Sequence, residues 1–402
     1  MKVLVAFNNY RSGGGGEALV VRTTHALLGQ HGVRVCTIEA DSRTIVTVAQ
    51  KVRAAIGGAF SWRSKRDMER LIHAERPDVV HAHNLYPLLS PSVLLASRER
   101  GVPVVMTIHH FGLTCPALHH LSRGQVCESC IGGREYWCVL KNCRGNPRES
   151  GAYAFRSVVA RKLNLFRKNV TILVALTQFA RKRLLAAGFD ADRVVVLPNM
   201  IRSDSRSVVF GKGDYVGFAG RLSSEKGVSI LLDAAFQLPE IPFRVAGGGP
   251  QSGLCAERAP KNVMLLGQLE GQTMGSFYRG ARCLVVPSVC LEMAPLVVGE
   301  AMAEGVPVIA SRIGGLPELV EDDVTGLLFE PGNASELVQK IRLLWDDASL
   351  CRRIGQMGYE RVRRERNEDV YYERLMGIYG AAIEMERNRK AGGRQGAEGG
   401  TW

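Results

Sequence analysis

The sequence predicts an α/β protein of two domains, each built on a parallel β-sheet, and three observations support that fold class. The chain has 402 residues, whereas a single hydrophobic core stops growing at roughly 250–300 residues. Short apolar runs rich in β-branched residues alternate with helical patterns, which indicates right-handed βαβ units. The alternation is interrupted once by a polar stretch and then begins again, as expected for a second domain.

The apolar runs predict two sets of strands with helices between them, for example over residues 17–30 and 180–187. Strands that are buried on both faces of a parallel sheet read as continuous apolar runs, as these do. The first set covers residues 3–7, 33–38, 79–82, 102–108, 170–176 and 194–197. The second covers residues 214–219, 243–246, 263–266, 283–287, 307–310 and 326–329.

A linker composition marks the domain boundary. Residues 198–213 are polar and rich in serine, and they carry Gly211 and Gly213, so we place the boundary near residue 205. The first domain then spans residues 1–205 and the second residues 206–367. Residues 368–390 have apolar side chains at helical spacing, and the glycine-rich tail 391–402 is expected to be disordered.

Composition excludes several classes of protein. Hydrophobic residues make up 46% and charged residues 23% of the chain, which indicates a globular protein and not a disordered one. No apolar stretch reaches the roughly 18 residues that span a bilayer. Residues 1–7 read as a buried strand and not as a signal peptide. We therefore expect a cytoplasmic protein whose ten cysteines are reduced.

The charge is concentrated in the first half of the chain. Residues 1–200 hold 28 Lys and Arg against 13 Asp and Glu, a balance of +15, whereas residues 201–402 hold 24 against 26, a balance of −2. Anionic lipid, a diphosphate-linked acceptor, nucleic acid or a merely basic surface would each explain this. No nucleic-acid-binding motif is present. Residues 51–70 hold six basic side chains beside Phe60 and Trp62, which suits either peripheral binding to an anionic membrane or an ordinary basic helix.

Two glutamates eight residues apart are the strongest chemical signal. Glu292 lies in the loop after an expected strand, and Glu300 lies two turns into the helix that Pro295 opens. The free amides of that first turn suit a phosphate group. Glu300 is then placed to accept hydrogen bonds from a ribose diol, and Glu292 to face a transferred sugar. A helix cap with a surface charge is the alternative for such a pair taken alone.

Two further motifs follow strands of the second domain. Arg221 and Lys226 lie in GRLSSEKG, after the strand that ends at Gly220, and two cations there suit a leaving diphosphate. Gly248 lies in the glycine turn VAGGGP, which is weak evidence by itself. Solvated surface charges and a plain tight turn are the alternatives.

Taken together and in this order, the motifs resemble the retaining glycosyltransferases of family 4, which have the GT-B fold. The matching text includes GRLSSEKG, VAGGGP, EMAPLVVGEAMAEGVPVIAS and GGLPELVEDDVTGLLFEPGN. The resemblance implies two Rossmann-like domains with parallel sheets facing a central cleft. It further implies that Arg221 and Lys226 bind the donor diphosphate, that Glu300 binds the ribose and that Glu292 binds sugar hydroxyls. The backbone around Ala294, Pro295, Leu296 and Val297 would face the phosphates. Many relatives carry Gly and Phe where this chain has Met293 and Ala294, which leaves the donor sugar open.

The first domain adds a glycine loop and a histidine. Gly13, Gly14, Gly15 and Gly16 follow the first strand, where a backbone without side chains lets an acceptor or phosphate approach closely. The loop lacks the GxGxxG spacing of dinucleotide-binding proteins. His109, at the end of a strand, resembles the T-x-H position of the family, which implies contact with the donor sugar. His81 and His83 form a weaker pair at a similar strand end, and a structural role is the alternative for each histidine.

A cysteine-rich insert occupies about residues 113–148. Cys127, Cys130, Cys138 and Cys143 have the spacing C-x2-C-x7-C-x4-C, with Cys115 as a further candidate ligand. The pattern suits a structural zinc site, although the loop between the pairs is short for known zinc modules. Reduced free thiols, or a redox or cluster role, are the alternatives.

These expectations combine into a retaining hexosyl-type glycosyltransferase that acts from a nucleotide-diphosphate-sugar. Its acceptor would be a lipid-linked compound or a glycan, in polysaccharide, glycolipid or lipid-linked glycan synthesis. No cofactor is required for catalysis, because Arg221 and Lys226 neutralise the leaving group. The helix over residues 368–390 would return to the first domain, as the resemblance implies. The rivals are a nucleotide-sugar epimerase or hydrolase on the same fold and a zinc-dependent scaffold protein.

Overall fold

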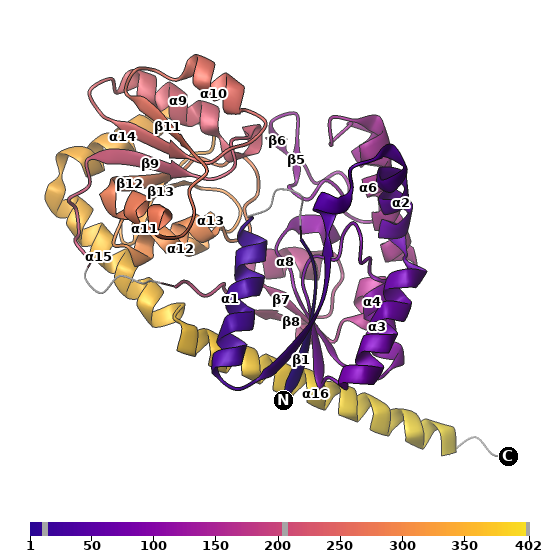
Figure 1. The fold of residues 1–402 in the computed structure, drawn as a ribbon. Helices are drawn as coiled ribbons and strands as arrows, with labels where there is room; N and C mark the ends of the chain where they lie inside the picture. Colours follow the sequence, from indigo (N-terminus) through magenta and orange to yellow (C-terminus); the bar gives the residue numbers. More distant parts are fainter. Residues whose placement is uncertain (10–14, 203–207, 399–402) are drawn as a thin grey trace. The chain divides into compact units, whose positions relative to one another are not determined.

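The computed structural model describes residues 1–9, 15–202 and 208–398 (Figure 1). Contacts divide the chain into two compact units. The first unit comprises residues 1–118, 128–198 and 371–402, and the second comprises residues 119–127 and 199–370. The last helix of the chain therefore belongs mostly to the first unit.

The first unit is built on a six-stranded parallel sheet in the order β2-β1-β3-β4-β7-β8. Each expected strand of the first set is confirmed. The strands are β1 (Lys2–Asn9), β2 (Arg34–Asp41), β3 (Val79–Ala82), β4 (Val104–Thr107), β7 (Ile172–Ala175) and β8 (Val194–Val196). Strands β3, β4 and β7 are buried along their whole length.

Helices cover both faces of this sheet, with α1 on one side and α3 and α4 on the other (Figure 1). Local signals explain where they begin: Thr47 and Gln50 form a capping box at α2, and Asn146 caps α6 ahead of a proline. The helices of this unit are α1 (Gly16–Gln30), α2 (Val48–Ala59), α3 (Trp62–Glu75), α4 (Ser92–Glu99), α5 (Tyr136–Leu140), α6 (Pro147–Lys162), α7 (Leu165–Asn169) and α8 (Gln178–Ala186).

The second unit has its own six-stranded parallel sheet, in the order β11-β10-β9-β12-β13-β14. The second set of expected strands is confirmed as well. They are β9 (Tyr215–Ala219), β10 (Phe243–Ala246), β11 (Val263–Gly267), β12 (Ala281–Val286), β13 (Val308–Ser311) and β14 (Gly326–Phe329). The helices are α9 (Val228–Gln237), α10 (Ser252–Arg258), α11 (Gly271–Gly280), α12 (Leu296–Ala303), α13 (Leu316–Leu319), α14 (Ala334–Asp346) and α15 (Ala348–Glu365).

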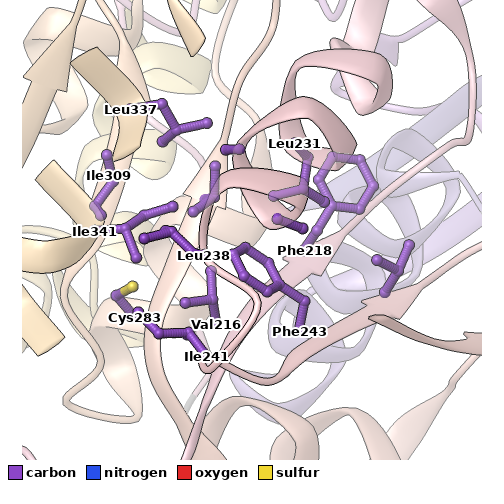
Figure 2. Packing of buried hydrophobic residues seen from close by; sticks show 14 of the residues in the cluster. Val216, Phe218, Leu231, Leu238, Ile241, Phe243, Cys283, Ile309, Leu337 and Ile341 are labelled. Atoms are coloured by element: carbon purple, nitrogen blue, oxygen red, sulfur yellow. The ribbon is translucent and has the colours of Figure 1, made fainter. Parts of the chain in front are cut away.

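Alternate residues of the second sheet enter two separate cores. On one face, Val216, Phe218 and Phe243 pack with Leu231 of α9 and with Leu238, the residue that follows that helix (Figure 2). Tyr215, Leu284 and Val308, in the alternating register, pack on the other face with α11 and α12. This two-sided burial is why the inner strands, such as β9, β12 and β13, read as continuous apolar runs.

The strand order places a binding edge in each sheet. In the second sheet the order reverses between β9 and β12, which are neighbours although β10 and β11 intervene in sequence. In the first sheet the corresponding neighbours are β1 and β3. Ligands of open parallel sheets bind outside the carboxyl ends of the strands at such reversals. The loops after β9 and β12, and those after β1 and β3, are therefore the first places to look for a site.

Two features of the structure differ from the sequence expectations. Residues 119–127, which include a short antiparallel hairpin of β5 (Leu121–Ser122) and β6 (Gln125–Val126), group with the second unit although they lie in the cysteine-rich insert. The last helix, α16 (Glu368–Glu398), continues past residue 390 into the expected tail. None of the helices in the described ranges has the length and hydrophobicity to span a bilayer.

Candidate active site

Lys226 and Glu292 meet at the point where the order of the second sheet reverses. Lys226 ends a short 3-10 turn after β9 (Ser224–Lys226), and Glu292 lies in the loop after β12. The Lys226 ammonium donates to Glu292 Oε1 at 2.6 Å, and the Ser288 hydroxyl donates to the same oxygen at 2.6 Å. Among the described residues both bonds go to Oε1, which leaves Oε2 of the carboxylate for a ligand.

The two charges of this pair hold each other ionised. Burial acts to raise the pKa of Glu292, but the Lys226 charge and the hydrogen bonds from Lys226 and Ser288 outweigh it and lower the pKa. Burial likewise acts to lower the pKa of Lys226, and the Glu292 charge raises it overall. The site therefore carries a fixed, buried carboxylate beside an ammonium group at neutral pH.

Close backbone packing fixes the loops around this pair. Gly227 has φ +70°, and a Cβ at its position would lie 1.8 Å from the carbonyl oxygen of Pro287. Gly247 has φ +138°, and a Cβ there would lie 1.9 Å from the carbonyl oxygen of Gly220. The amide of Gly220 donates to Ala246 O at 3.0 Å. The glycines thus let the loops after β9, β10 and β12 touch through their backbones.

The helix α12 adds the second carboxylate. It begins after Pro295, so the amides of Leu296 and Val297 lie in its first turn, where no intrahelical acceptor exists. Glu300 accepts a hydrogen bond at Oε2 from the Tyr278 hydroxyl at 2.7 Å. Burial raises the pKa of Glu300, and the Tyr278 bond opposes that shift. Tyr278 orients one oxygen of Glu300, and among the described residues Oε1 is left for a ligand.

Arg221 and Gly248 complete this edge from neighbouring loops. The Arg221 side chain is exposed. Burial acts to raise the pKa of Glu225, but hydrogen bonds and the charges of His119 and Arg221 outweigh it and lower the pKa. Gly248 is exposed and a Cβ there would meet nothing within 4 Å. Arg221, Lys226 and the first-turn amides of α12 suit a diphosphate. Glu292 and Glu300 each have one oxygen that accepts from a protein group, and the other oxygen suits a hydroxyl group of the ligand.

In the first unit, His109 and His83 form a hydrogen-bonded pair after β4 and β3. Nδ1 of His83 lies 2.8 Å from Nε2 of His109. His81 is instead a structural residue, because its two ring nitrogens bond to Tyr379 Oη at 2.7 Å and to Thr107 Oγ1 at 2.8 Å. A pocket adjoins the pair, lined by His83, Asn84, Tyr86, Thr107, His109, His110 and apolar neighbours that include Phe166.

The histidines of this cluster are neutral at physiological pH. Burial, followed by the neighbouring His110 and His81, lowers the pKa of His109 to about 3. Burial also lowers the pKa of His83 well below its ordinary value. A neutral imidazole donates through one nitrogen and accepts through the other, so His109 is suited to bind a hydroxyl group and not to supply a positive charge.

Glu17 is a residue of this edge that the sequence motifs did not single out. It lies in the first turn of α1 and accepts a hydrogen bond at Oε1 from the Asn84 amide at 2.9 Å. Burial raises its pKa to about 7, although the Asn84 bond opposes the shift. Of the expected glycine loop, Gly15 and Gly16 precede Glu17, while Gly13 and Gly14 lie outside the described residues.

His119, Tyr278 and Ser288 were also missed by the sequence reasoning. His119 belongs to the second unit, and it helps to lower the pKa values of Glu225 and Glu292 against the opposing effect of burial. The cysteine-rich insert therefore contributes a residue near the Lys226–Glu292 pair. No sequence pattern predicted it, because it lies just before the β5–β6 hairpin, far from β9 and β12 in sequence.

The cysteine-rich insert holds thiols close to one another. Burial, followed by the neighbouring Cys143, Cys130 and Cys115, raises the pKa of Cys138 to about 12. Cys127 groups with the second unit, whereas the other four belong to the first. In the described part of the chain no three His, Cys, Asp or Glu side chains form a group that could hold a metal ion. The zinc site at Cys127, Cys130, Cys138 and Cys143 thus stays a prediction.

Two protein-family models match the chain. The model described as "Glycosyltransferase Family 4" matches residues 13–205, and the model described as "Glycosyl transferases group 1" matches residues 201–361. The two matches meet within the stretch that we assigned as the linker.

Curated relatives match over most of the chain or over part of it. An uncharacterized glycosyltransferase of Methanocaldococcus jannaschii is 27% identical over 301 residues, which is 73% of this chain and 72% of that protein. D-inositol 3-phosphate glycosyltransferase 1 of Catenulispora acidiphila is 29% identical over 333 residues, 78% of this chain and 74% of that protein. A sulfoquinovosyl transferase of Arabidopsis thaliana is 33% identical over 175 residues, covering 42% and 34%.

Solved structures share the fold over nearly the whole chain. Sucrose-phosphate synthase of Thermosynechococcus elongatus matches with a TM-score of 0.71 and 18% identity, covering 95% of this chain and 99% of that one. Anabaena HepE in complex with UDP-glucose matches with a TM-score of 0.65 and 19% identity, covering 95% and 100%. At these identities the likeness concerns the fold.

Proposed function

This chain is a GT-B glycosyltransferase of the family 4 type, and from that premise we propose that it transfers a hexose-type sugar from a nucleoside diphosphate sugar with retention of configuration. The observation that carries the proposal is the Lys226–Glu292 pair at the reversal of the second sheet, beside the first turn of α12 and Glu300. Anabaena HepE was solved with UDP and with UDP-glucose, which supports a nucleotide sugar as the donor.

Each residue of that edge has a task in this reaction. Arg221, Lys226 and the amides of Leu296 and Val297 bind the diphosphate and stabilise the charge that grows on it as it leaves. Glu300 accepts hydrogen bonds from the ribose through Oε1, while Tyr278 holds its other oxygen. Glu292 binds sugar hydroxyls through Oε2, while Lys226 and Ser288 hold Oε1.

Retention follows if the acceptor attacks the anomeric carbon from the face that the diphosphate leaves. The bond from the anomeric carbon to the diphosphate oxygen breaks and the bond to the acceptor oxygen forms. The acceptor proton passes to the departing phosphate oxygen, so the step balances without a separate base. His109 is neutral and contributes a hydrogen bond to the donor sugar near the reacting carbon.

The acceptor that we propose is a glycan or a lipid-linked compound. The names of the relatives indicate different acceptors and donors, among them D-inositol 3-phosphate and a sulfoquinovosyl group, so the family membership leaves the acceptor open. The basic balance of the first half of the chain favours an acceptor with phosphate groups at a cytoplasmic membrane surface.

A donor screen followed by a transfer assay tests this function. Thermal shift with UDP-, GDP- and ADP-sugars identifies the donor, and product analysis by NMR gives the anomeric configuration. We expect Glu300→Gln to lower kcat/KM by about 10- to 150-fold, from the loss of one charge-assisted contact of roughly 1.5–3 kcal/mol. Glu257→Gln, on the exposed side of α10, is the matched control and should behave as wild type.

Two outcomes would overturn parts of the proposal. Wild-type activity in Glu300→Gln would refute the assignment of the ribose contact, and an inverted product would refute retention. Donor turnover that is unaffected by any acceptor would favour an epimerase or hydrolase on the same fold.

A further inference from the structure

The helix α2 exposes a row of apolar side chains that nothing in the glycosyl transfer uses. Val48, Val52 and Ile56 are spaced four residues apart, so they lie on one side of the helix. Their exposed fractions are 74%, 54% and 66%. Two further apolar residues flank the row in sequence, Val46 at 67% and Trp62 at 65% exposure. Single exposed apolar residues are ordinary, but five within 17 residues form an unusual concentration.

This exposure belongs to a well-formed helix. The capping box of Thr47 and Gln50 fixes where α2 begins. Ala54, Gly58 and Ala59 of the same helix are buried, and α2 packs against α6 within the first unit. The helix therefore already has a buried face, and the row of Val48, Val52 and Ile56, here called the α2 apolar row, lies outside it.

Basic residues border the α2 apolar row on both sides. At about 100° per residue, Lys51 and Arg53 fall on opposite flanks of the row, and both are exposed. From Val46 to Arg66 the sequence holds Lys51, Arg53, Arg63, Lys65 and Arg66 and no acidic residue. Lys65 takes no part in the surface, because it pairs with Glu99 at 2.6 Å and with Glu69 at 3.2 Å.

We propose that the α2 apolar row docks the first unit on an anionic lipid bilayer. Val48, Val52 and Ile56 enter the boundary between head groups and acyl chains, and Lys51 and Arg53 contact the anionic head groups on either side. An apolar row between two basic flanks, in a stretch of sequence without acidic residues, is complementary to such a surface. A single-stranded nucleic acid would instead require aromatic rings on which its bases stack, and the row has none. A duplex would contact basic side chains through its phosphates and would not use the apolar row. This attachment is separate from the transfer reaction, so either proposal stands if the other fails.

Vesicle co-sedimentation of the full chain tests the proposal. Phosphatidylcholine vesicles with and without phosphatidylglycerol are compared at low and high salt. We expect binding to the anionic vesicles only, and a steep loss at high salt. The variant Val48→Ser/Val52→Ser/Ile56→Ser should bind at least about tenfold more weakly, because it loses the three aliphatic groups that enter the bilayer. Phe236→Ser, on α9 of the second unit at 77% exposure, is the matched control and should bind as wild type.

The charge contribution is tested separately. Lys51→Gln/Arg53→Gln should weaken binding at low salt and flatten its salt dependence. Arg258→Gln/Lys261→Gln, two exposed basic residues of the second unit, should leave both unchanged. Donor hydrolysis, or transfer to a water-soluble acceptor, should stay at the wild-type level in the α2 variants, which also verifies their fold.

Several results would overturn the proposal. It fails if the wild type does not bind anionic vesicles at low salt, or if the triple serine variant binds them as well as the wild type. A dimer of the wild type that the triple variant abolishes, without vesicle binding, would assign the row to a second copy of the chain. Binding to RNA in place of vesicles, lost in Lys51→Gln/Arg53→Gln, would assign the surface to nucleic acid.

Discussion

Lys226 and Glu292 form a partly buried ion pair that should also stabilise the folded protein. Glu292 is 7% exposed, so the loss of Lys226 leaves a buried carboxylate without its counter-charge. We expect Lys226→Ala to lower the free energy of unfolding by about 1–3 kcal/mol at pH 7, measured by urea unfolding. Lys226→Ala/Glu292→Ala should recover part of this loss, and additive effects of the two changes would contradict the coupling.

The same pair predicts a dependence on acid. The folded-state pKa of Glu292 is lowered, so its contribution is present above the ordinary glutamate pKa and is lost as the pH falls through the folded-state value. The difference in stability between the wild type and Glu292→Gln should therefore shrink toward acidic pH. An unchanged difference between pH 7 and strongly acidic pH would show that the pair is not ionised in the folded protein.

Glu17 should respond to pH in the opposite sense. Its pKa of about 7 is raised from the ordinary glutamate value by burial, so the folded protein holds the proton more tightly than the unfolded chain. This stabilisation is fully present below the ordinary value of 4.5 and disappears as the pH rises through about 7. Glu17→Gln should remove that decline. Equal pH profiles of Tm for Glu17→Gln and wild type would refute it.

Single residues were predictable only where the sequence around them has a recognisable pattern. Arg221, Lys226, Glu292 and Glu300 lie in motifs that directly follow strands, so their place at the sheet edge could be anticipated. Their partners Ser288, Tyr278 and His119 could not, because each is chosen by tertiary packing and not by spacing in the sequence. Lys65, which the sequence places among membrane-facing basic residues, is bound by Glu69 and Glu99.

At the scale of elements, the contact between the loops after β9 and β10 makes a sharp test. A Cβ at Gly247 would overlap the Gly220 carbonyl oxygen, whereas a Cβ at Gly248 would meet nothing. We expect Gly247→Ala to cost about 1–3 kcal/mol of stability, because the backbone must shift and φ is positive. Gly248→Ala is the control and should unfold within about 0.5 kcal/mol of wild type. Chemical denaturation measures both, and equal losses would refute the close approach.

The strands were easier to predict than the connections. The central strands follow directly from apolar runs, because a strand buried on both faces must be apolar throughout. The edge strands β2 and β11 also contain apolar runs, although their residues are only partly buried or exposed. The hairpin of β5 and β6 was not foreseen, since its strands have two residues each and no periodicity to detect. The end of α16 was misplaced because the glycines after residue 390 suggest a tail, whereas the helix continues to Glu398.

At the scale of the whole molecule, α16 completes the first unit from the far end of the chain. Tyr371, Leu375, Tyr379 and Ala382 are buried at helical spacing, and Tyr379 bonds to His81. We expect Tyr379→Phe to lower the free energy of unfolding by about 1–3 kcal/mol, because a buried His81 nitrogen loses its partner. Tyr372→Phe keeps its ring stacked on His31 and should change stability by less than about 0.5 kcal/mol. Calorimetry compares the two, and equal Tm values would refute the role of the hydroxyl group.

The return of α16 also bears on the order of events during synthesis. Domains generally fold in the order in which the ribosome delivers them. Here residues 1–198 emerge first, yet the side chains that cover His81 arrive only with residues 371–382. The first unit therefore keeps part of its interior uncovered until residues 371–382 have been made. Residues 199–370 of the second unit are all translated before that point. The half of the protein that is translated first is thus the last to be finished, and it is the half that nascent-chain chaperones would meet.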